Sequence, residues 1–477
     1  MERNIIGREP EKKRLMELYK SKQPEFIAVY GRRRVGKTFI IRELFEKKIT
    51  FDLVSLANAS TKEQLINFNI TLNQISKKEN NIAGNWLEAF VQLRGFLENS
   101  IDSRKLVFID EIPWFDTPRS GFLMALEHFW NSWGCVQKNL ILIVCGSSSS
   151  WIINKLINNH GGLYNRLTAS IFLQPFTIAE TQKFLKHQKI NYNIQQLSEC
   201  YMLTGGVPFY LSKIKRELDL SQNIDNMFFG KQSELKNEFH NLYNSLFKDS
   251  DDYTKIVEML SKKNKGSTRS EIAKKTNISS GGTLTKLLQN LEYSGFIRAY
   301  TTIGKTKRDV LYQLMDNFTL FHFKYLANNN FKNEHFWTNS LNTPQHNAWA
   351  GNAFEMLMLQ HINEIKQALG IAGIQSAVYS WRSGKSNTGA QIDLVIDRKD
   401  GMLNLCEIKF YQSHFTITKQ YEANLRNKIV CFQEETGTHK AINVLLLTTY
   451  GLTKNKYSDI IQKTITINDI LRLNIML

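Results

Sequence analysis

The chain has 477 residues, a length that favours about three domains of ordinary size. Hydrophobic residues make up 42% of it, which is normal for a globular protein, and no stretch approaches the roughly 18 apolar residues that span a membrane. The 61 Lys and Arg residues outnumber the 44 Asp and Glu residues, so the net charge is +17. A balance this basic favours a polyanionic partner, although contacts with ribosome-rich or membrane surfaces would also produce it.

The cysteine pattern and the first residues indicate in which cellular compartment the protein is expected. The five cysteines are scattered and form no C-x-x-C pair, which argues against a disulfide framework or a zinc site and favours a reducing cytoplasm. The opening MERNIIGREPEKKR is charged and has no apolar core behind it, so we expect no signal peptide. We therefore expect a cytoplasmic protein with no membrane partner.

Residues 1–177 alternate between helical and strand patterns. An amphipathic helix is expected within residues 1–20, and apolar strand patterns begin at Phe26, Ile49, Lys105 and Leu140 with helical patterns between them. This alternation predicts an α/β domain in which a parallel sheet lies between two layers of helices. We expect this three-layer αβα domain to end near residue 177.

The first strand leads into a phosphate-binding pattern. Residues 26–39 read FIAVYGRRRVGKTF and contain the G-x-x-x-x-G-K-T spacing of a Walker A motif, or P-loop, between a strand and a helix. Gly31 and Gly36 let backbone N–H groups close around phosphates. The Lys37 ammonium reaches the β- and γ-phosphates, and the Thr38 hydroxyl can ligate magnesium. The residues between the glycines complete the predicted nucleotide-binding loop: Arg32, Arg33, Arg34 and Val35. The alternative, a chance match in a loop, does not explain the strand and helix around it.

Two acidic residues end the apolar run KLVFIDEIPWF. In a Walker B pattern Asp110 would hold magnesium, largely through water, and Glu111 would polarise the attacking water. The alternative is an ordinary acidic strand end. Beside a separate Walker A motif in an alternating fold, we favour the Walker B interpretation.

Two further residues are candidates for the γ-phosphate region. Ser147 follows the strand LILIVCG, where a polar sensor of the γ-phosphate belongs; a helix N-cap within SSSSW is the equal alternative. Arg166, in GGLYNRLTASIFLQPFT, is the candidate cation for transition-state charge, either within the subunit or across an interface. Its alternative is a plain surface residue.

The next region is helical and ends before a basic segment. Residues 178–245 are expected to form a small helical lid, bent at Gly205-Gly206 and Pro208 in TGGVPFYL. Residues 246–335 are expected to hold a winged helix and a connector, because they read helix, turn, helix and two strands around the basic turn IGKTKRD.

The recognition helix of this winged helix is predicted near residues 282–293. The stretch 252–315 holds 12 Lys and Arg residues against 5 Asp and Glu residues, so it contributes much of the positive charge. DNA binding and protein contact within the ATPase both remain open, because a fold does not fix a function.

Residues 336–477 are expected to form a C-terminal α/β domain with a second acidic constellation. WAGNAFEMLMLQHINEI is an amphipathic helix that carries Glu355, and QIDLVIDRKDGMLNLCEIKFY reads as a hairpin that turns at residues 399–401. With the turn centred on Asp400, Asp393 opposes Glu407, and directly opposed residues have Cβ atoms about 5 Å apart.

Opposed like charges destabilise a sheet unless something binds between them. A divalent cation would do so, with oxygen ligands from Asp393, Glu407 and the carbonyl group of Ile408. Lys409 shares a sheet face with Glu407 and could activate water or stabilise a phosphorane. The alternative is a solvated sheet edge without a metal.

The pattern E…D…E-x-K over helix, strand and strand resembles the PD-(D/E)XK core of restriction-endonuclease-like nucleases. The resemblance implies metal coordination by Asp393 and Glu407, a catalytic lysine in Lys409, and the first-helix acid in Glu355. No Pro precedes the aspartate, which follows Gln391-Ile392, so the match is incomplete.

Over its whole length the chain resembles archaeal-type P-loop ATPases of the STAND/AAA+ branch that have a nuclease-like C-terminal domain. The matching pieces are IIGREPE, GRRRVGKT, FIDEIPW, CGSSSSW, LYNRLTASIFLQPF, GGVPFYL and LMDNFTLFHFKYL. The resemblance implies ATP binding and hydrolysis with Mg²⁺, and metal-dependent nuclease chemistry in which Mn²⁺ could serve.

We therefore predict an ATP-hydrolysing protein that acts on DNA and whose ATPase controls phosphodiester cleavage by the C-terminal domain. A nucleotide-dependent switch or DNA-binding regulator without nuclease activity is the alternative. A helicase or loader motor, in which Arg166 completes a neighbour's site in a ring, is a third. DNA is the expected partner, and a second copy of the chain or a regulatory protein are further candidates.

Overall fold

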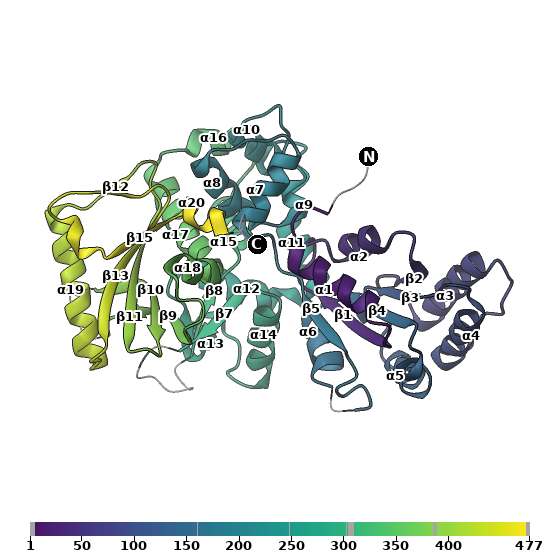
Figure 1. Ribbon diagram of the computed structural model, residues 1–477. Helices are drawn as coiled ribbons and strands as arrows, with labels where there is room; N and C mark the ends of the chain where they lie inside the picture. Colours follow the sequence, from purple (N-terminus) through teal and green to yellow (C-terminus); the bar gives the residue numbers. More distant parts are fainter. Residues whose placement is uncertain are drawn as a thin grey trace. The chain divides into compact units, whose positions relative to one another are not determined.

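The structure is a computed structural model and describes residues 5–159, 161–247, 249–301, 303, 310–384 and 389–473. The chain divides into two units, Met1–Gln174 and Pro175–Leu477 (Figure 1). Most of the predicted basic turn at 303–309 lies outside the described residues. None of the helices in these ranges is long and apolar enough to cross a membrane.

The first unit is built on a five-stranded parallel sheet with the strand order β2-β3-β4-β1-β5. The strands are β1 (Glu25–Tyr30), β2 (Ile49–Val54), β3 (Lys105–Asp110), β4 (Leu140–Gly146) and β5 (Ala169–Phe172). Every residue of β4 is buried, as expected for a strand covered on both faces. The carboxyl ends of β1, β4 and β3 therefore lie side by side at one edge of the sheet.

Helices cover both faces of this sheet. One core joins it to α1 and α2, and a second, rich in aromatic side chains, joins it to α3, α4 and α5. The helices are α1 (Glu9–Lys20), α2 (Lys37–Phe45), α3 (Thr61–Ser76), α4 (Trp86–Asn99), α5 (Phe122–Ser132) and the short α6 (Ser149–Ile152). The predicted α/β class with a parallel central sheet is confirmed.

The second unit begins with helices that share one core with the rest of the unit. They are α7 (Ile178–His187), α8 (Ile194–Thr204), α9 (Pro208–Leu211), α10 (Leu220–Ile224) and α11 (Glu238–Leu246). Gly205 and Gly206 have φ values of +61° and +66°. A Cβ atom on Gly206 would lie 2.2 Å from the Phe176 carbonyl oxygen, so the bend between α8 and α9 requires glycine.

The basic segment follows the predicted order of helix, turn, helix and two strands. Its elements are α12 (Ser250–Ser261), β6 (Ser267–Thr268), α13 (Arg269–Thr276), α14 (Gly282–Tyr293), β7 (Ile297–Tyr300) and β8 (Leu311–Leu314). The strands form an antiparallel sheet with the order β6-β8-β7. Two short helices, α15 (Asn317–Phe321) and α16 (Phe336–Ser340), connect it to the C-terminal region.

The C-terminal region contains a mixed sheet with the order β15-β13-β11-β10-β9. Its core joins one face of this sheet to α17, α18 and α20, and α19 packs on the other face (Figure 1). The strands are β9 (Ser376–Arg382), β10 (Gln391–Arg398), β11 (Met402–Lys409), β13 (Ala441–Thr448) and β15 (Lys463–Thr466), with β12 (Phe415–Thr416) and β14 (Leu452–Thr453) as a separate pair. The helices are α17 (Pro344–Gln360), α18 (Ile362–Leu369), α19 (Lys419–Thr436) and α20 (Ile467–Leu473).

Candidate functional site

The P-loop connects the carboxyl end of β1 to α2. Gly31 has a φ of +148°, and a Cβ atom on it would lie 2.2 Å from the carbonyl oxygen of Leu173. Gly36 has a φ of +92° and is the N-cap residue of α2. These glycines let the loop turn closely into the first turn of α2, whose N–H groups can bind phosphate.

The Lys37 side chain folds back into the P-loop. It is 5% exposed, and its ammonium donates hydrogen bonds to the carbonyl oxygens of Gly31 and Arg32, both at 3.0 Å. Phosphate oxygens are stronger acceptors for an ammonium than neutral carbonyl groups. The loop therefore holds the cation where an incoming triphosphate can take it over.

Thr38 and Asp110 join the P-loop to the end of β3. The Thr38 hydroxyl donates to Asp110 Oδ2 at 2.8 Å, and the Glu111 N–H donates to Asp110 Oδ1 at 2.9 Å. Burial raises the pKa of Asp110, and the hydrogen bond from Thr38 opposes that change. A hydroxyl and a carboxylate side by side suit Mg²⁺, which prefers oxygen ligands next to phosphate groups.

The Glu111 carboxylate is held by the residue that follows β4, the strand between β1 and β3. Ser147 follows β4 and donates to Glu111 Oε2 from its backbone N–H at 3.0 Å and from its hydroxyl at 2.9 Å. Ser55 Oγ donates to the Glu111 carbonyl oxygen at 2.8 Å. Glu111 itself has a φ of +50°, an uncommon backbone conformation that often marks functional sites.

The N-cap alternative for Ser147 is wrong. The N-cap residue of α6 is Ser148, and its side chain makes no capping hydrogen bond. Ser147 points to Glu111 because β4 ends between the P-loop strand and the Glu111 strand.

Arg166 lies elsewhere in this unit. It is exposed and precedes β5, whose start is anchored where the Thr168 N–H donates to the Phe26 carbonyl oxygen at 2.8 Å. Phe26 is near the amino end of β1, about 17 Å along the strand from Gly31 at about 3.3 Å per residue. The register therefore places Arg166 on the amino side of the sheet, so a role within its own P-loop is not supported. A role across an interface stays a prediction.

The P-loop residues fit a magnesium nucleotide. The first turn of α2 supplies N–H groups for phosphate, Lys37 supplies the matching charge, and the Thr38–Asp110 pair supplies oxygen ligands for the metal. The sequence motifs found each of these residues, but not the hydrogen bonds between Ser147 and Glu111.

Comparison with known proteins supports the same assignment. Residues 5–214 match the model of a family described as an ATPase domain predominantly from Archaea. This segment is similar to that ATPase domain. An uncharacterized protein of Methanocaldococcus jannaschii is 26% identical over 332 residues, which cover 68% of this chain and 69% of that protein.

Two solved structures resemble the chain at low identity. The Walker-type ATPase of Pyrococcus abyssi is 18% identical, with a TM-score of 0.48, and covers 67% of this chain and 96% of its own. The ORC2 protein of Aeropyrum pernix, solved in ADPNP–ADP complexes, is 12% identical, with a TM-score of 0.45, and covers 68% of this chain and 94% of its own. At these values the two structures add nothing on activity or partners.

In the second unit, the C-terminal hairpin has the predicted register. Leu394 pairs with Cys406 and Val395 with Leu405. These pairs end one residue before Asp393, and β10 shifts register against β9 between Ile392 and Val395. Asp393 and Glu407 lie on neighbouring strands, and their direct opposition stays a prediction.

A lysine from the basic segment lies between two of the predicted site residues. Lys265, in the loop between α12 and β6, donates to Asp393 Oδ1 at 2.8 Å and also to Glu355 Oε1. All three side chains are nearly buried. Glu355 thus comes to the cluster from α17 as predicted, but it reaches Asp393 through an ammonium group.

Two more lysines hold the third carboxylate. Lys428 of α19 donates to both oxygens of Glu407, at 2.8 and 2.7 Å. The ammonium of Lys409 lies 3.3 Å from Glu407 Oε1. Lys409 is also attracted to Asp393 and Glu355, so the two groups lie together. We define them as the carboxylate cluster: Glu355, Asp393, Glu407, Lys265, Lys409 and Lys428.

Burial and charge set the pKa values in this cluster. Burial, followed by repulsion from Asp393, raises the pKa of Glu355 to about 7. Burial would also raise the pKa of Asp393, but Lys265 and Lys409 outweigh it and lower that pKa. Burial opposes the charge of Lys265, yet attraction to Asp393 and Glu355 raises its pKa. Lys265 therefore stays charged at neutral pH.

As they stand, these residues do not fit a divalent metal. In the part of the chain that the structure describes, no group of three or more His, Cys, Asp or Glu side chains is placed to hold a metal ion. Asp393 and Glu407 are engaged by ammonium groups, and the Ile408 N–H donates to Asp393 Oδ2 at 3.0 Å. The predicted metal centre is corrected to a lysine–carboxylate network, and no cleavage step is derived through a metal.

The sequence patterns missed Lys265 and Lys428. Lys428 is one of several charged residues on α19, and its spacing does not mark it. Lys265 lies in the basic run KKNKG, 128 residues before Asp393. The only signal was the charge of that run, which we assigned to DNA contact.

Proposed function

We propose that the chain is a Mg²⁺-dependent ATPase that acts on DNA. The nucleotide bound to its first unit would control the activity of its second unit. The observation that carries the ATPase role is the joining of Thr38 to Asp110 and of Ser147 to Glu111 at the carboxyl ends of three adjacent strands. The matching ATPase domain family supports the same role.

The chain's own residues have distinct tasks in hydrolysis. Lys37 would leave the P-loop carbonyl oxygens for the β- and γ-phosphates, and Thr38 with Asp110 would hold the metal. The ion held there would supply positive charge that offsets the charge of the phosphate groups. Glu111 would accept the proton of the attacking water, a task typically worth about 10²–10⁴ in rate. Ser147 keeps that carboxylate in place.

The DNA role rests on charge and on the predicted winged helix. The α14 helix exposes Thr283, Lys286 and Gln289 along one face. Arg269 fixes its start, because the guanidinium donates to Thr285 Oγ1 at 2.6 Å and to the Gly281 carbonyl oxygen at 2.7 Å. A fixed helix with a polar exposed face suits groove or backbone contact.

The experiment measures phosphate release from ATP by the full chain, with and without DNA, beside Lys37→Ala. We expect Mg²⁺-dependent release that DNA changes and that the variant lacks. DNA binding should weaken steeply with salt, because phosphate contacts release counterions. Equal release by wild type and variant would overturn the ATPase role, and salt-independent binding would overturn the DNA role.

Phosphodiester cleavage by the C-terminal region is the second candidate function. Asp393 and Glu407 on neighbouring strands, with Lys409 attracted to both and to Glu355, support it. Plasmid and single-stranded DNA are the substrates to test, with Mg²⁺ or Mn²⁺, with and without ATP. If wild type and Lys409→Ala cleave neither, the chain is a nucleotide switch or DNA-binding regulator instead.

Substitution of Arg166 tests whether several copies of the chain assemble into a motor. If it completes a neighbour's site, Arg166→Ala and Lys37→Ala chains should each be inactive alone and regain part of the ATPase rate when mixed. A chain that stays monomeric while hydrolysing ATP would exclude that role.

A further inference from the structure

A cavity in the C-terminal region is lined by basic side chains and contains no residue of the carboxylate cluster. It has a volume of about 710 Å³ and is formed by the segment from β14 to β15 together with the residue before β12. Four of its lining residues are basic and one is acidic: His414, Lys454, Lys456, Lys463 and Asp459. A hollow with this excess of basic groups attracts an anion.

One fixed turn carries two of these lysines. Lys454 and Lys456 flank Asn455, whose side chain donates to the Ile417 carbonyl oxygen at 2.9 Å. Ser458 closes the turn, because its hydroxyl accepts from the Asn455 N–H at 3.0 Å and donates to the Asn455 carbonyl oxygen at 2.7 Å. Within the described ranges, neither lysine has a carboxylate partner. Both charges are therefore available to a bound anion.

His414 is held at the same cavity by a close approach to glycine. Gly451 has a φ of +146°, and a Cβ atom on it would lie 3.1 Å from the imidazole of His414. The Phe415 N–H donates to the Gly451 carbonyl oxygen at 2.8 Å and joins the two segments there. An imidazole N–H beside the two lysines can donate a further hydrogen bond to an anion.

Lys463 differs from the other two lysines. It lines the cavity at β15, but its ammonium donates to the Ala368 carbonyl oxygen of α18 at 2.9 Å. Thr464 next to it pairs with Leu446, which packs with the α19 side of the sheet, whereas α18 lies on the opposite side. The charge of Lys463 is therefore directed away from the cavity.

The cavity lies at the same edge of the sheet as Lys409 of the cluster. Thr466, which lines the cavity, pairs with Thr448 on β13, and Thr448 pairs with Lys409 on β11. Neighbouring strands are about 4.8 Å apart, so Thr466 and Lys409 lie about 10 Å from each other. The Lys409 ammonium is 5.8 Å from the ring of Tyr421, which packs edge-on against Phe415.

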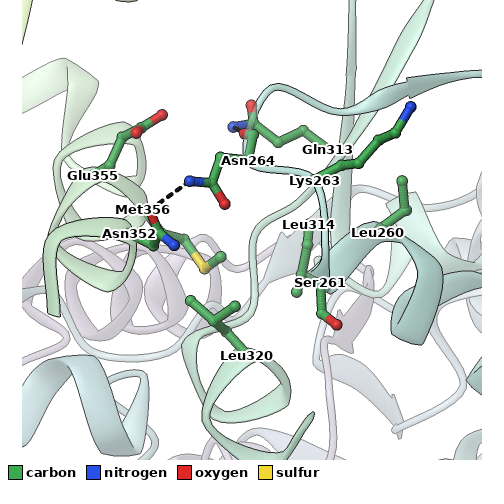
Figure 2. A pocket seen from close by; sticks show the side chains of 10 residues that line it. All are labelled: Leu260, Ser261, Lys263, Asn264, Gln313, Leu314, Leu320, Asn352, Glu355 and Met356. Carbon is green, nitrogen blue, oxygen red and sulfur yellow. Dashed lines mark hydrogen bonds between the residues drawn. The ribbon is translucent and has the colours of Figure 1, made fainter. Parts of the chain in front are cut away.

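The cluster is more open at this edge than toward the basic segment. Asn264 donates a hydrogen bond to Asn352 on α17, and Figure 2 shows this pair beside Glu355. The Lys265 side chain, which binds Glu355, is 11% exposed, whereas the Lys409 side chain is 32% exposed. A large ligand would therefore meet the cluster at Lys409, on the side of the basic cavity.

We propose that the basic cavity binds backbone phosphates of DNA through Lys454, Lys456 and His414, and that the bound strand continues past Lys409. Two lysines on either side of one turn suit a chain of phosphates. At 3.4 Å per nucleotide along a duplex strand, about 10 Å corresponds to about three nucleotides. The inference rests on the proposed DNA role and names a surface that would carry it.

The test is binding of a fluorescent DNA duplex to the full chain, measured by anisotropy over a series of salt concentrations. Lys454→Gln and Lys456→Gln should each weaken binding at least about threefold at low salt and make the salt slope shallower by about one, because each loses a phosphate contact. Lys463→Gln is the matched control and should stay within about 1.5-fold of wild type, since its ammonium is bound at Ala368. All three lysines are exposed, so the variants should fold.

Each outcome decides the proposal. Wild-type salt slopes in both cavity variants would overturn it and leave the DNA role to the basic segment. An equal loss in Lys463→Gln would also overturn it, because net charge alone would then explain the effect. If wild type binds no DNA, the DNA role and the cavity proposal fall together. Weaker binding of inorganic phosphate or of anionic lipid vesicles in the cavity variants, with DNA binding unchanged, would assign the cavity to that ligand instead.

Discussion

Ser147 donates two hydrogen bonds to one carboxylate oxygen of Glu111, from its N–H at 3.0 Å and its hydroxyl at 2.9 Å. These bonds fix the direction of a carboxylate that would otherwise rotate about its own side chain. A general base must lie within hydrogen-bond reach of the water that it deprotonates. Ser147 is therefore a positioning residue, and β4 rather than β3 decides where Glu111 points.

We expect Ser147→Ala to lower kcat for ATP about tenfold and to leave nucleotide affinity within about twofold. The loss is partial because the backbone N–H bond remains, and it falls on kcat because Glu111 acts in the transition state. Ser148→Ala is the matched control, since Ser148 makes no capping hydrogen bond. Steady-state hydrolysis measures both, and an unchanged kcat in Ser147→Ala would remove the positioning role.

Thr38 offers a test of metal binding. Thr38→Ala removes the hydroxyl that lies 2.8 Å from Asp110, so the gain in nucleotide affinity on adding Mg²⁺ should fall at least about tenfold. Thr38→Ser keeps the hydroxyl and should keep the gain. Fluorescent-nucleotide titrations with and without Mg²⁺ distinguish the variants. A full Mg²⁺ effect in Thr38→Ala would contradict the assignment.

Gly31→Ala should destabilise the first unit by at least about 2 kcal/mol, because its Cβ atom would lie 2.2 Å from a backbone oxygen at a strained φ. Gly95→Ala on α4 meets no atom within 4 Å and should stabilise by about 0.5–1 kcal/mol. Urea unfolding of both variants measures the difference. Equal stability of the two would show that the close approach at Leu173 is not a constraint.

His322 predicts a pH dependence of stability in the second unit. It is 5% exposed and stacks on Phe239 with ring centroids 3.9 Å apart, and His240 lies nearby. Burial, then His240, lowers the pKa of His322 to about 3. Below pH 6.5 the unfolded chain takes up a proton that the folded chain does not, so stability is full above 6.5 and falls toward pH 3.

The matching variant is His322→Phe, which keeps a ring on Phe239. Its free energy of unfolding should fall less than that of wild type between pH 7.5 and 5.5, by up to about 1.4 kcal/mol. Denaturant unfolding at the two pH values checks this. Parallel pH profiles would show that His322 is not buried in its neutral form.

Local patterns predicted much of this fold. The P-loop depends on eight consecutive residues, and the pairing of β10 with β11 follows from one tight hairpin turn, so neighbouring sequence determines both. The order of the parallel strands did not follow, because β4 enters between β1 and β3 from a distant part of the chain. The contact between Ser147 and Glu111 depends on that order.

The error at the carboxylate cluster has the same origin. Spacing alone brought two carboxylates and Lys409 together, and a metal was the simplest way to balance them. Lys265 and Lys428 supply that balance from elements 128 and 21 residues away from their partners, and no local pattern points to them. Long-range partners of buried charges are set by tertiary packing.

The measurement that tests the account most directly is ATP hydrolysis by Glu111→Gln in the full chain. This variant keeps the shape of the side chain and removes the base, so it should bind ATP with Mg²⁺ as tightly as wild type and hydrolyse it at least about 10²-fold more slowly. Hydrolysis at the wild-type rate with binding intact would contradict Glu111 as the base, and with it the proposed ATPase mechanism.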